Sequence, residues 1–546
     1  MGISIGNERI SEQELRTLNE PAKNQDLIAF PEWTEYRKKN GLDPLGMQNS
    51  SVNLYQSLLP GISNVTLRMR YYGLYAWLAQ RYAKEIGDTD PNNWKRHVRR
   101  AEALYALVAA HHGGEPGVAG TDWATRALEE APGDTIDFKE AAEPGSEAYY
   151  LKQAWGAFGA AYRSQLFDIG IFDRSDDHEI PLPSKDLGEG LAQAFEQSLG
   201  SRAELYFGLI KLGSVTHDEL DELAPLLPSR IASESTEQKF YEAILLSRAS
   251  APSSGALARK LSILLILKVA DFLERAPRAD EVRWVLYAGH DQQGNILSLN
   301  DPSLEVQRSR WWVYHANDLC HIAHEALLKF TLDTLGDYPS GLGMERLIGR
   351  CAQHILSEIS PVPETWSALL EGLEPASNAF DASDPDSEAS LTNEIIRAGR
   401  DDARICTPDT AAKAVRLLAI LHRRIDLVGA DLTEPLGGFN PDAFRSLLSE
   451  TRFLDRHREA PFGQTIERVL EERVIRRHLW VALRKLRHQG DYTFLIESDD
   501  GKLRLREKDG PVFTNPRLGP AITFLKDIGL LGNTGLTEAG REAIYS

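Results

Sequence analysis

Four side chains that could bind a metal ion lie within eight consecutive positions of one predicted helix. The helix Arg310–Leu335 carries Asp318, His321, His324 and Glu325 on the side opposite its apolar stripe. Imidazole and carboxylate groups on neighbouring helical turns can bind one divalent ion. Their spacing, however, is neither His-Glu-x-x-His nor its inversion, and contact of this polar face with another domain would explain it as well. We therefore predict no metal or other cofactor and keep these four residues as alternative ligands.

A second group of residues has the chemistry of phosphate recognition. The segment Thr465–Gly490 is predicted to form one helix, with Thr465 as its cap and Gly490 at its end. On a helical wheel, one face contains Arg473, Arg476, Arg477, Trp480, Arg484 and Arg487. The opposite face, which we expect to pack against the protein, contains Ile475, Leu479, Ala482 and Leu486.

Guanidinium groups donate paired hydrogen bonds to phosphate oxygens, and an exposed indole can stack on a base. The arginine face therefore predicts a nucleic-acid-binding surface. Two alternatives stay open, namely a surface that docks an acidic protein and a face that is merely solvated. The segment "DYTFLIESDDGKLRLRE", with Asp-Asp-Gly between two alternating runs, predicts a β-hairpin just after this helix. Arg504 and Arg506 lie on one side of its second strand and would extend the basic surface.

The last thirty or so residues predict a helix, a tight turn and a short closing helix. Asn515 is a good helix cap and Pro516 suits the first helical position. In this order of elements the C-terminus resembles the end of winged-helix (winged helix-turn-helix) nucleic-acid-binding domains. The resemblance implies that Asn515–Asp527 is the recognition helix, with Thr514, Asn515 and Arg517 as the base-contacting residues. It departs from the family where the predicted hairpin takes the place of the middle helix.

Two further patterns raise the alternative of a metal-dependent nuclease or a ribonuclease. Glu497, Asp500 and Lys502 have a spacing similar to that of PD-(D/E)xK nucleases, although Asp500 falls in the predicted hairpin turn. Arginine–histidine pairs similar to those of HEPN ribonucleases occur three times, at Arg310–His315, Arg452–His457 and Arg473–His478. A pattern that matches three times does not single out a site. No Walker A loop, dinucleotide fingerprint, kinase signature or Gly-x-Ser-x-Gly elbow is found, so we predict a non-enzymatic protein.

The elements that carry these residues are predicted to be mainly helical. Helical spacing of apolar residues predicts helices over 65–86, 92–112, 149–166, 185–199, 236–248, 256–274, 310–335 and 344–359. Besides the hairpin, only Arg283–Gly289 suggests a strand. The predicted fold class is a mainly α, multidomain protein with a C-terminal winged-helix-like module that contains a β-hairpin.

The chain length of 546 residues predicts two to four domains. The acidic stretch Glu374–Ser390, rich in Ala, Ser and Pro, suggests a flexible linker. We predict helical domains at 1–200 and 201–373, a linker at 374–392 and a C-terminal domain at 393–546. Leu166–Phe195 parallels Leu525–Ile544, with Asp-Ile-Gly at a helix end and a glycine in the next helix. Duplication of a winged-helix-like corner and two unrelated corners both explain this similarity.

Charge and composition set the expected partners. The formal net charge is −19, yet residues 411–546 carry 22 Lys and Arg against 19 Asp and Glu. An acidic body repels polyanions, whereas the slightly basic C-terminal region does not. Three widely spaced cysteines argue against a disulfide framework, and the N-terminus lacks the pattern of a signal or transit peptide. The longest apolar run, Leu261–Leu273, is too short to span a bilayer, so we predict a cytoplasmic protein without a membrane partner.

These observations predict a subunit that binds nucleic acid, with DNA as the expected form, through its C-terminal region and binds protein partners through its acidic helical body. The alternatives are a metal-dependent nuclease and a scaffold whose arginine face docks an acidic protein. No motif supports the further expectation of a bacterial multi-subunit system that acts on DNA or in antiviral defence.

Overall fold

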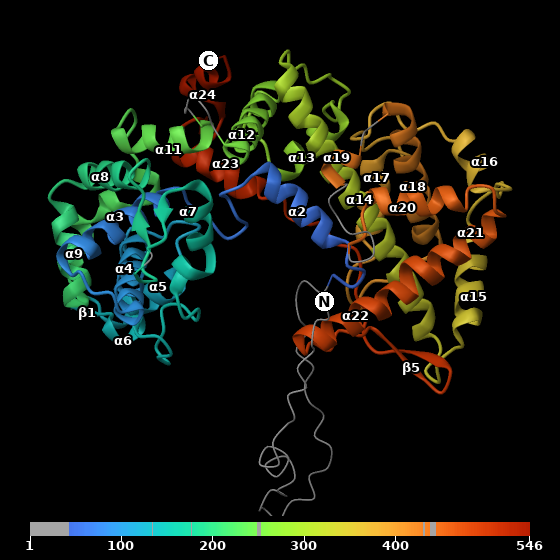
Figure 1. The fold of residues 1–546 in the computed structure, drawn as a ribbon, viewed down its shortest axis with the longest axis horizontal. Helices are drawn as coiled ribbons and strands as arrows, with labels where there is room; N and C mark the ends of the chain where they lie inside the picture. The colour runs from blue at the N-terminus through green and yellow to red at the C-terminus, as the bar shows by residue number, and fades with distance from the viewer. Residues whose placement is uncertain are drawn as a thin grey trace, which may run out of the picture. The chain divides into compact units, whose positions relative to one another are not determined.

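Helices make up most of the chain in a computed structural model of the protein (Figure 1). The structure describes residues 43–133, 135–175, 177–247, 253–429, 432–436 and 444–545, so the predictions for the N-terminus and for Arg248 lie outside the described residues. Helix accounts for 61% and strand for 5%, which confirms the mainly α prediction. Asp43–Ser546 forms one compact unit by its contacts. The domain boundaries near 200, 373 and 392 stay predictions.

The helices from Arg70 to Leu246 pack around a core rich in aromatic rings. They are α3 (Arg70–Glu85), α4 (Pro91–His111), α5 (Thr121–Glu130), α6 (Lys139–Ala142), α7 (Arg163–Ile169), α8 (Gly188–Leu199), α9 (Arg202–Leu212), α10 (His217–Glu222) and α11 (Thr236–Leu246), with short turns η1 (Phe158–Tyr162), η2 (Ala224–Leu226) and η3 (Pro228–Arg230). The ring of Tyr71 lies 4.7 Å from that of Tyr162 and 5.1 Å from that of Tyr105. These rings bury large apolar surfaces and fix the helices relative to one another.

Two pairs of very short strands close loops in this part of the chain. β1 (Ile136–Asp137) pairs with β4 (Ser214–Val215), and β2 (Phe172–Asp173) pairs with β3 (Leu182–Pro183), both antiparallel. Each strand has only two residues, so the strands fix loop ends and do not build a sheet core.

The 35-residue helix α14 (Pro302–Gly336) runs through the rest of the structure, and every residue from Trp311 to Leu335 is buried. Helices on all sides cover it (Figure 1), namely α2 (Gln48–Leu58), α12 (Ser254–Phe272), α13 (Ala279–Ala288), α15 (Met344–Ser357), α17 (Glu388–Ile396), α18 (Pro408–Val428) and α20 (Leu447–Arg456). The strand predicted at Arg283–Gly289 is wrong, because residues 283–288 belong to α13 and Gly289 caps that helix. A short apolar run fits a buried helix as well as a strand.

The C-terminal region adds helices and the predicted hairpin. Its remaining elements are α16 (Trp366–Glu371), α19 (Thr433–Leu436), α21 (Phe462–Arg468), η4 (Val469–Ile475), α22 (Arg476–Gln489), β5 (Ile496–Asp499), β6 (Lys502–Leu505), α23 (Leu518–Asp527), β7 (Leu531–Gly532), β8 (Gly535–Leu536) and α24 (Glu538–Tyr545). The β5–β6 hairpin is confirmed, and Asp500 and Gly501 form its two-residue turn with positive φ angles.

The segment predicted as a flexible linker contacts the helical body at several points. Phe380 is buried and stacks on Trp284, with ring centroids 5.8 Å apart. The Asn378 side chain donates a hydrogen bond to the Asp291 carbonyl at 2.7 Å. Helix α17 begins at Glu388, inside the predicted linker, and this buried carboxylate pairs with Arg424. The contacts place residues 378–388 against α13 and α18.

The two similar segments noted in the sequence form the same local structure. Each is a helix, a left-handed glycine, a pair of two-residue strands and a second helix, as α7–β2–β3–α8 and as α23–β7–β8–α24. The Ser184 hydroxyl donates to the Gly170 carbonyl at 2.6 Å and accepts from the Gly188 amide at 3.0 Å.

Thr537 makes the matching hydrogen bonds in the second segment, to the Gly529 carbonyl at 2.7 Å and from the Gly540 amide at 3.1 Å. A Cβ at Gly188 would clash with the Ile171 carbonyl, as one at Gly540 would with the Leu530 carbonyl. The shared hydrogen bonds and close approaches explain why both helices contain glycine at this position.

One buried ion pair joins α3 to α11 inside the aromatic core. The Arg70 guanidinium donates to the Glu237 carboxylate at 2.9 and 3.0 Å, and neither side chain reaches solvent. Because removal of one partner leaves the other charge buried and unpaired, Glu237→Gln should lower the free energy of unfolding by about 3–5 kcal/mol. Glu143→Gln, which breaks the exposed pair with Arg96, should lower it by at most about 1 kcal/mol. Urea denaturation followed by circular dichroism measures both, and equal losses would contradict the prediction.

Candidate functional site

The basic helix predicted at Thr465–Gly490 exists, but it is not a uniform α-helix. It runs from Phe462 to Gln489 through α21, the π-helical turn η4 and α22. A π-helix contains more residues per turn than an α-helix. The faces of α22 are therefore rotated relative to those that a regular helical wheel assigns.

Two of the predicted phosphate-binding arginines point into the protein. Arg473 is only 6% exposed, lies 3.4 Å from the Glu450 carboxylate and stacks on the Phe453 ring at 3.9 Å. Arg477 is 4% exposed and donates to the Leu45 carbonyl at 2.7 Å. Burial lowers the pKa of Arg477 to about 10. These two guanidinium groups hold the start of the described chain and α20 against the helix.

The outward side of α22 carries Trp480, Leu483, Leu486 and Arg487, all exposed, together with Arg476 beside Glu471 and the partly exposed Arg484. Trp480 is 41% exposed and is the only exposed tryptophan among the described residues. The guanidinium groups of Arg477 and Arg484 lie 4.5 and 4.9 Å from its ring centre. Leu486 was expected to pack and instead faces solvent. The outward side of α22 thus presents an indole beside guanidinium groups, with Leu483 and Leu486 next to it.

The hairpin arginines lie opposite acidic residues of the same hairpin. Arg506 contacts the Glu497 carboxylate at 2.7 Å, and Arg504 contacts Asp499 at 3.1 Å. The predicted nuclease residues Glu497, Asp500 and Lys502 are therefore part of a charge ladder and an exposed turn. Among the described residues, Glu497 and Asp500 do not belong to the group of acidic and histidine side chains that could hold a metal ion.

The predicted recognition helix is held against the protein by the residues expected to read bases. The helix begins at Leu518, because Arg517 adopts a left-handed conformation in front of it. The Arg517 side chain is buried and donates to the Leu59 carbonyl at 3.2 Å, and the Thr514 hydroxyl donates to Asp318 at 2.9 Å. Asn515 is exposed, and its carbonyl accepts from Asn64. The helix–turn–helix ending is present, but a winged-helix module is not confirmed and stays a prediction.

Two histidines of the arginine–histidine pairs are buried and have little access to solvent. His315 lies edge-on to the Trp284 and Tyr287 rings, and burial lowers its pKa well below the usual value. Burial also lowers the pKa of His478 to about 4, and its ring bonds the Pro44 carbonyl and the Leu495 amide. Their surroundings are those of structural histidines.

The polar side of α14 faces other parts of the chain, as the domain-contact alternative predicted. Asp318 accepts hydrogen bonds from Thr514 and lies 3.6 Å from the Arg283 guanidinium. His324 lies 3.5 Å from the Glu450 carboxylate, and its other ring nitrogen contacts the Cys320 carbonyl at 2.8 Å. Neither residue is free to bind an ion with the other, because they face different partners.

His321 and Glu325 have a different environment, in which a third acidic residue takes part. The His321 Nε2 atom lies 2.8 Å from Glu325 Oε1, and its Nδ1 atom lies 3.5 Å from Asp318 Oδ1. Burial lowers the pKa of His321, but the Glu325 and Asp318 carboxylates outweigh it and raise that pKa well above the usual value. Asp43, far away in the sequence, completes a group of ligand atoms within 4.8 Å of one another. No sequence pattern points to Asp43, because nothing in its spacing connects it to α14.

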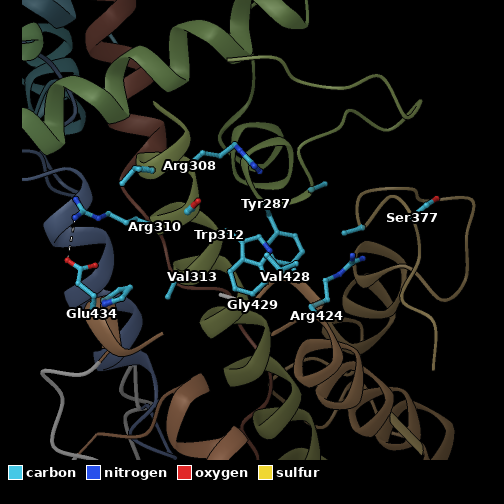
Figure 2. Close-up of a pocket in the computed structure, with 15 residues that line it drawn as sticks. Tyr287, Arg308, Arg310, Trp312, Val313, Ser377, Arg424, Val428, Gly429 and Glu434 are labelled. Atoms are coloured by element: carbon cyan, nitrogen blue, oxygen red, sulfur yellow. Dashed lines mark hydrogen bonds and ion pairs between the residues drawn. The ribbon is translucent and has the colours of Figure 1, made fainter. Parts of the chain in front are cut away.

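A surface pocket of about 560 Å³ lies beside the first turns of α14 (Figure 2). The rings of Tyr287 and Trp312 stack at its centre, 5.8 Å apart and nearly parallel. Its three arginines each face a carboxylate, with Arg308 at Glu305, Arg310 at Glu434 and Arg424 at Glu388. Because these charges are compensated, the pocket offers an anion little unpaired positive charge.

No protein-family model, curated protein or solved structure matches the chain.

No helix in the described ranges has both the length and the hydropathy that a membrane span needs. The three cysteines Cys320, Cys351 and Cys406 are free and buried.

Asp527, at the end of α23, attaches this helix to the segment before α3. The Asp527 carboxylate accepts from the Arg68 guanidinium at 2.8 Å and from the Met69 amide at 3.0 Å. Asp527→Asn removes a buried charge-assisted hydrogen bond and should lower the free energy of unfolding by about 1.5–3 kcal/mol. Glu542→Gln, an exposed change on α24, should leave it within about 0.5 kcal/mol. Equal stability of the Asp527 variant and the parent in urea would show that α23 is not anchored in this way.

Proposed function

We propose that this chain is a non-enzymatic nucleic-acid-binding protein that uses the outward side of α22. The observation that carries the proposal is the exposed Trp480 ring, with the partly exposed Arg484 guanidinium 4.9 Å from its centre. Trp480, Leu483 and Leu486 are exposed on one side of α22, and grouped exposed apolar side chains mark interaction surfaces. An indole next to cations combines a stacking platform for bases with donors for phosphate.

The apolar neighbours of Trp480 favour unpaired bases over the backbone of a duplex. Leu483 and Leu486 lie on the same outward side and are exposed. Duplex DNA presents mainly phosphates and sugars to a helix that lies on its surface, and leucine gains little there. Single strands expose the faces of their bases, which stack on aromatic and apolar side chains beside a cationic groove. We therefore propose single-stranded DNA or RNA as the ligand class.

The same two leucines favour a second candidate, the docking of an acidic protein segment. Exposed apolar residues flanked by arginines are typical of surfaces that bind an amphipathic helix. In this case the chain would be a scaffold whose arginine-bearing helix selects an acidic partner. Binding to nucleic acid separates the two candidates, because a protein-docking surface has no need of phosphate.

Fluorescence anisotropy with a labelled 20-nucleotide single strand and the matching duplex tests the proposal. We expect tighter binding to the single strand and a linear fall of log affinity with log salt concentration. Trp480→Ala should weaken binding by about 1–3 kcal/mol. The triple variant Arg476→Glu, Arg484→Glu and Arg487→Glu should weaken it further and flatten the salt dependence.

A matched control changes three exposed arginines of the aromatic helical part, Arg96→Glu, Arg126→Glu and Arg202→Glu. It alters the net charge by the same amount, so nucleic-acid binding should stay near that of the parent. Absence of binding at 50 mM salt, or equal losses in the two triple variants, would overturn the proposal. The first result would favour the protein-docking candidate.

A further inference from the structure

A group of three metal-ligating side chains is enclosed where the start of the described chain meets α14. Its members are Asp43, His321 and Glu325, and their ligand atoms all lie within 4.8 Å of one another. The two α14 residues have almost no contact with solvent, and Asp43 is 7% exposed. It is the only such group found among the described residues. Two carboxylates this close in a buried place need a positive charge between them, which either a protonated His321 or a bound cation supplies.

The Asp43 carboxylate is held so that one oxygen is left for a ligand. Its Oδ1 atom accepts hydrogen bonds from the backbone amides of Met47 at 2.8 Å and Gln48 at 3.1 Å, where α2 begins. Its Oδ2 atom is buried and has no hydrogen-bond partner in the described part of the chain. An unsatisfied buried carboxylate oxygen is costly unless something else binds it.

The Glu325 carboxylate is oriented in a similar way. Its Oε2 atom accepts from the Val512 amide at 3.2 Å, and its Oε1 atom accepts from the Gln48 side chain at 3.2 Å. These bonds come from two segments far apart in the sequence, so the carboxylate position is set from outside α14. Hydrogen bonds of this kind are what orient the ligands of protein-bound metals.

The geometry of His321 distinguishes an ion site from a charged histidine held by two acids. Its nitrogens lie 2.8 Å from Glu325 and 3.5 Å from Asp318, yet neither forms a well-aligned hydrogen bond. An imidazolium that served only to neutralise these acids would direct its N–H groups at their oxygens. Instead, a histidine nitrogen lies close to two carboxylates and has no well-aligned hydrogen bond to either. A shared ion requires this arrangement of ligand atoms.

We propose that Asp43, His321 and Glu325 bind one divalent transition-metal ion of the zinc and manganese class. One imidazole and two carboxylates suit such ions, whereas Mg²⁺ is rarely held by imidazole and prefers water and oxygen ligands. Asp318 lies 3.5 Å from His321 Nδ1 and is not one of the three ligands. The proposal is independent of the α22 surface and gives the ion no catalytic role, because the group is buried.

The ion would hold the start of α2 to α14 and, through the same segment, to α22. The Pro44 carbonyl contacts His478, and the Leu45 carbonyl accepts from Arg477. The Lys485 ammonium donates to the main-chain oxygen of Asp43 at 3.3 Å. Metal binding at Asp43 would therefore stabilise three elements at once, and its loss should be visible in the melting temperature of the whole chain.

The test uses the full, untagged chain, dialysed with a chelator and then titrated with Zn²⁺, Mn²⁺ or Mg²⁺ by calorimetry and by thermal unfolding. We expect one Zn²⁺ or Mn²⁺ per chain at the site, a rise of several degrees in melting temperature, and at least ten-fold weaker binding of Mg²⁺. Asp43→Asn keeps the side-chain oxygen that accepts from Met47 and Gln48 and removes only the charge. It should lose that one ion, by at least a ten-fold fall in affinity.

Two further variants keep the test decisive. His321→Gln should also lose the ion, and if it does not fold, Asp43→Asn decides alone. Glu450→Gln is the matched control, since Glu450 is equally buried near α14 but faces His324 and Arg473. It should retain the ion. The proposal is overturned if the parent binds neither Zn²⁺ nor Mn²⁺, or if Asp43→Asn binds them as the parent does.

Discussion

The burial of α14 along 25 consecutive residues is the constraint on which the rest of the structure depends. A helix that is buried on every face is usually apolar all round, but this one carries Asp318, His321, His324 and Glu325. Each buried charge must be matched by a hydrogen-bond donor, an opposite charge or an ion, because an unmatched one costs several kcal/mol. The partners come from segments that are hundreds of residues apart. The polar side of α14 therefore decides where those segments lie.

This requirement accounts for the C-terminal part of the chain. The Thr514 hydroxyl binds Asp318 and the Val512 amide binds Glu325, which fixes the irregular segment before α23. Helix α23 is then anchored at its other end through Asp527 and Arg68. Thr514 and Arg517, which were expected to read bases, thus contact the interior of the protein. The outward side of α22 stays exposed.

The sequence predicted the parts of the structure that depend on local spacing. Amphipathic helices such as α4 and α15 and the Asp-Asp-Gly hairpin follow from periodicity and turn chemistry, which act within a few residues. The predicted arginine face differs from the structure at Arg473 and Arg477, which are buried. One reason is that η4 is a π-helix, and no residue pattern indicates this change in the number of residues per turn. The sequence analysis did not identify Asp43, because its neighbour in the ligand group, His321, lies 278 residues further along the chain.

Hydrogen–deuterium exchange tests whether the polar side of α14 holds distant segments in place. Peptides covering 43–50 and 509–516 should exchange as slowly as the middle of α14 in the parent. In Glu325→Ala both should exchange much faster, while residues 404–408, held through Lys329 and Asp333, should stay protected. Fast exchange of 43–50 and 509–516 in the parent, with α14 itself protected, would contradict the claim.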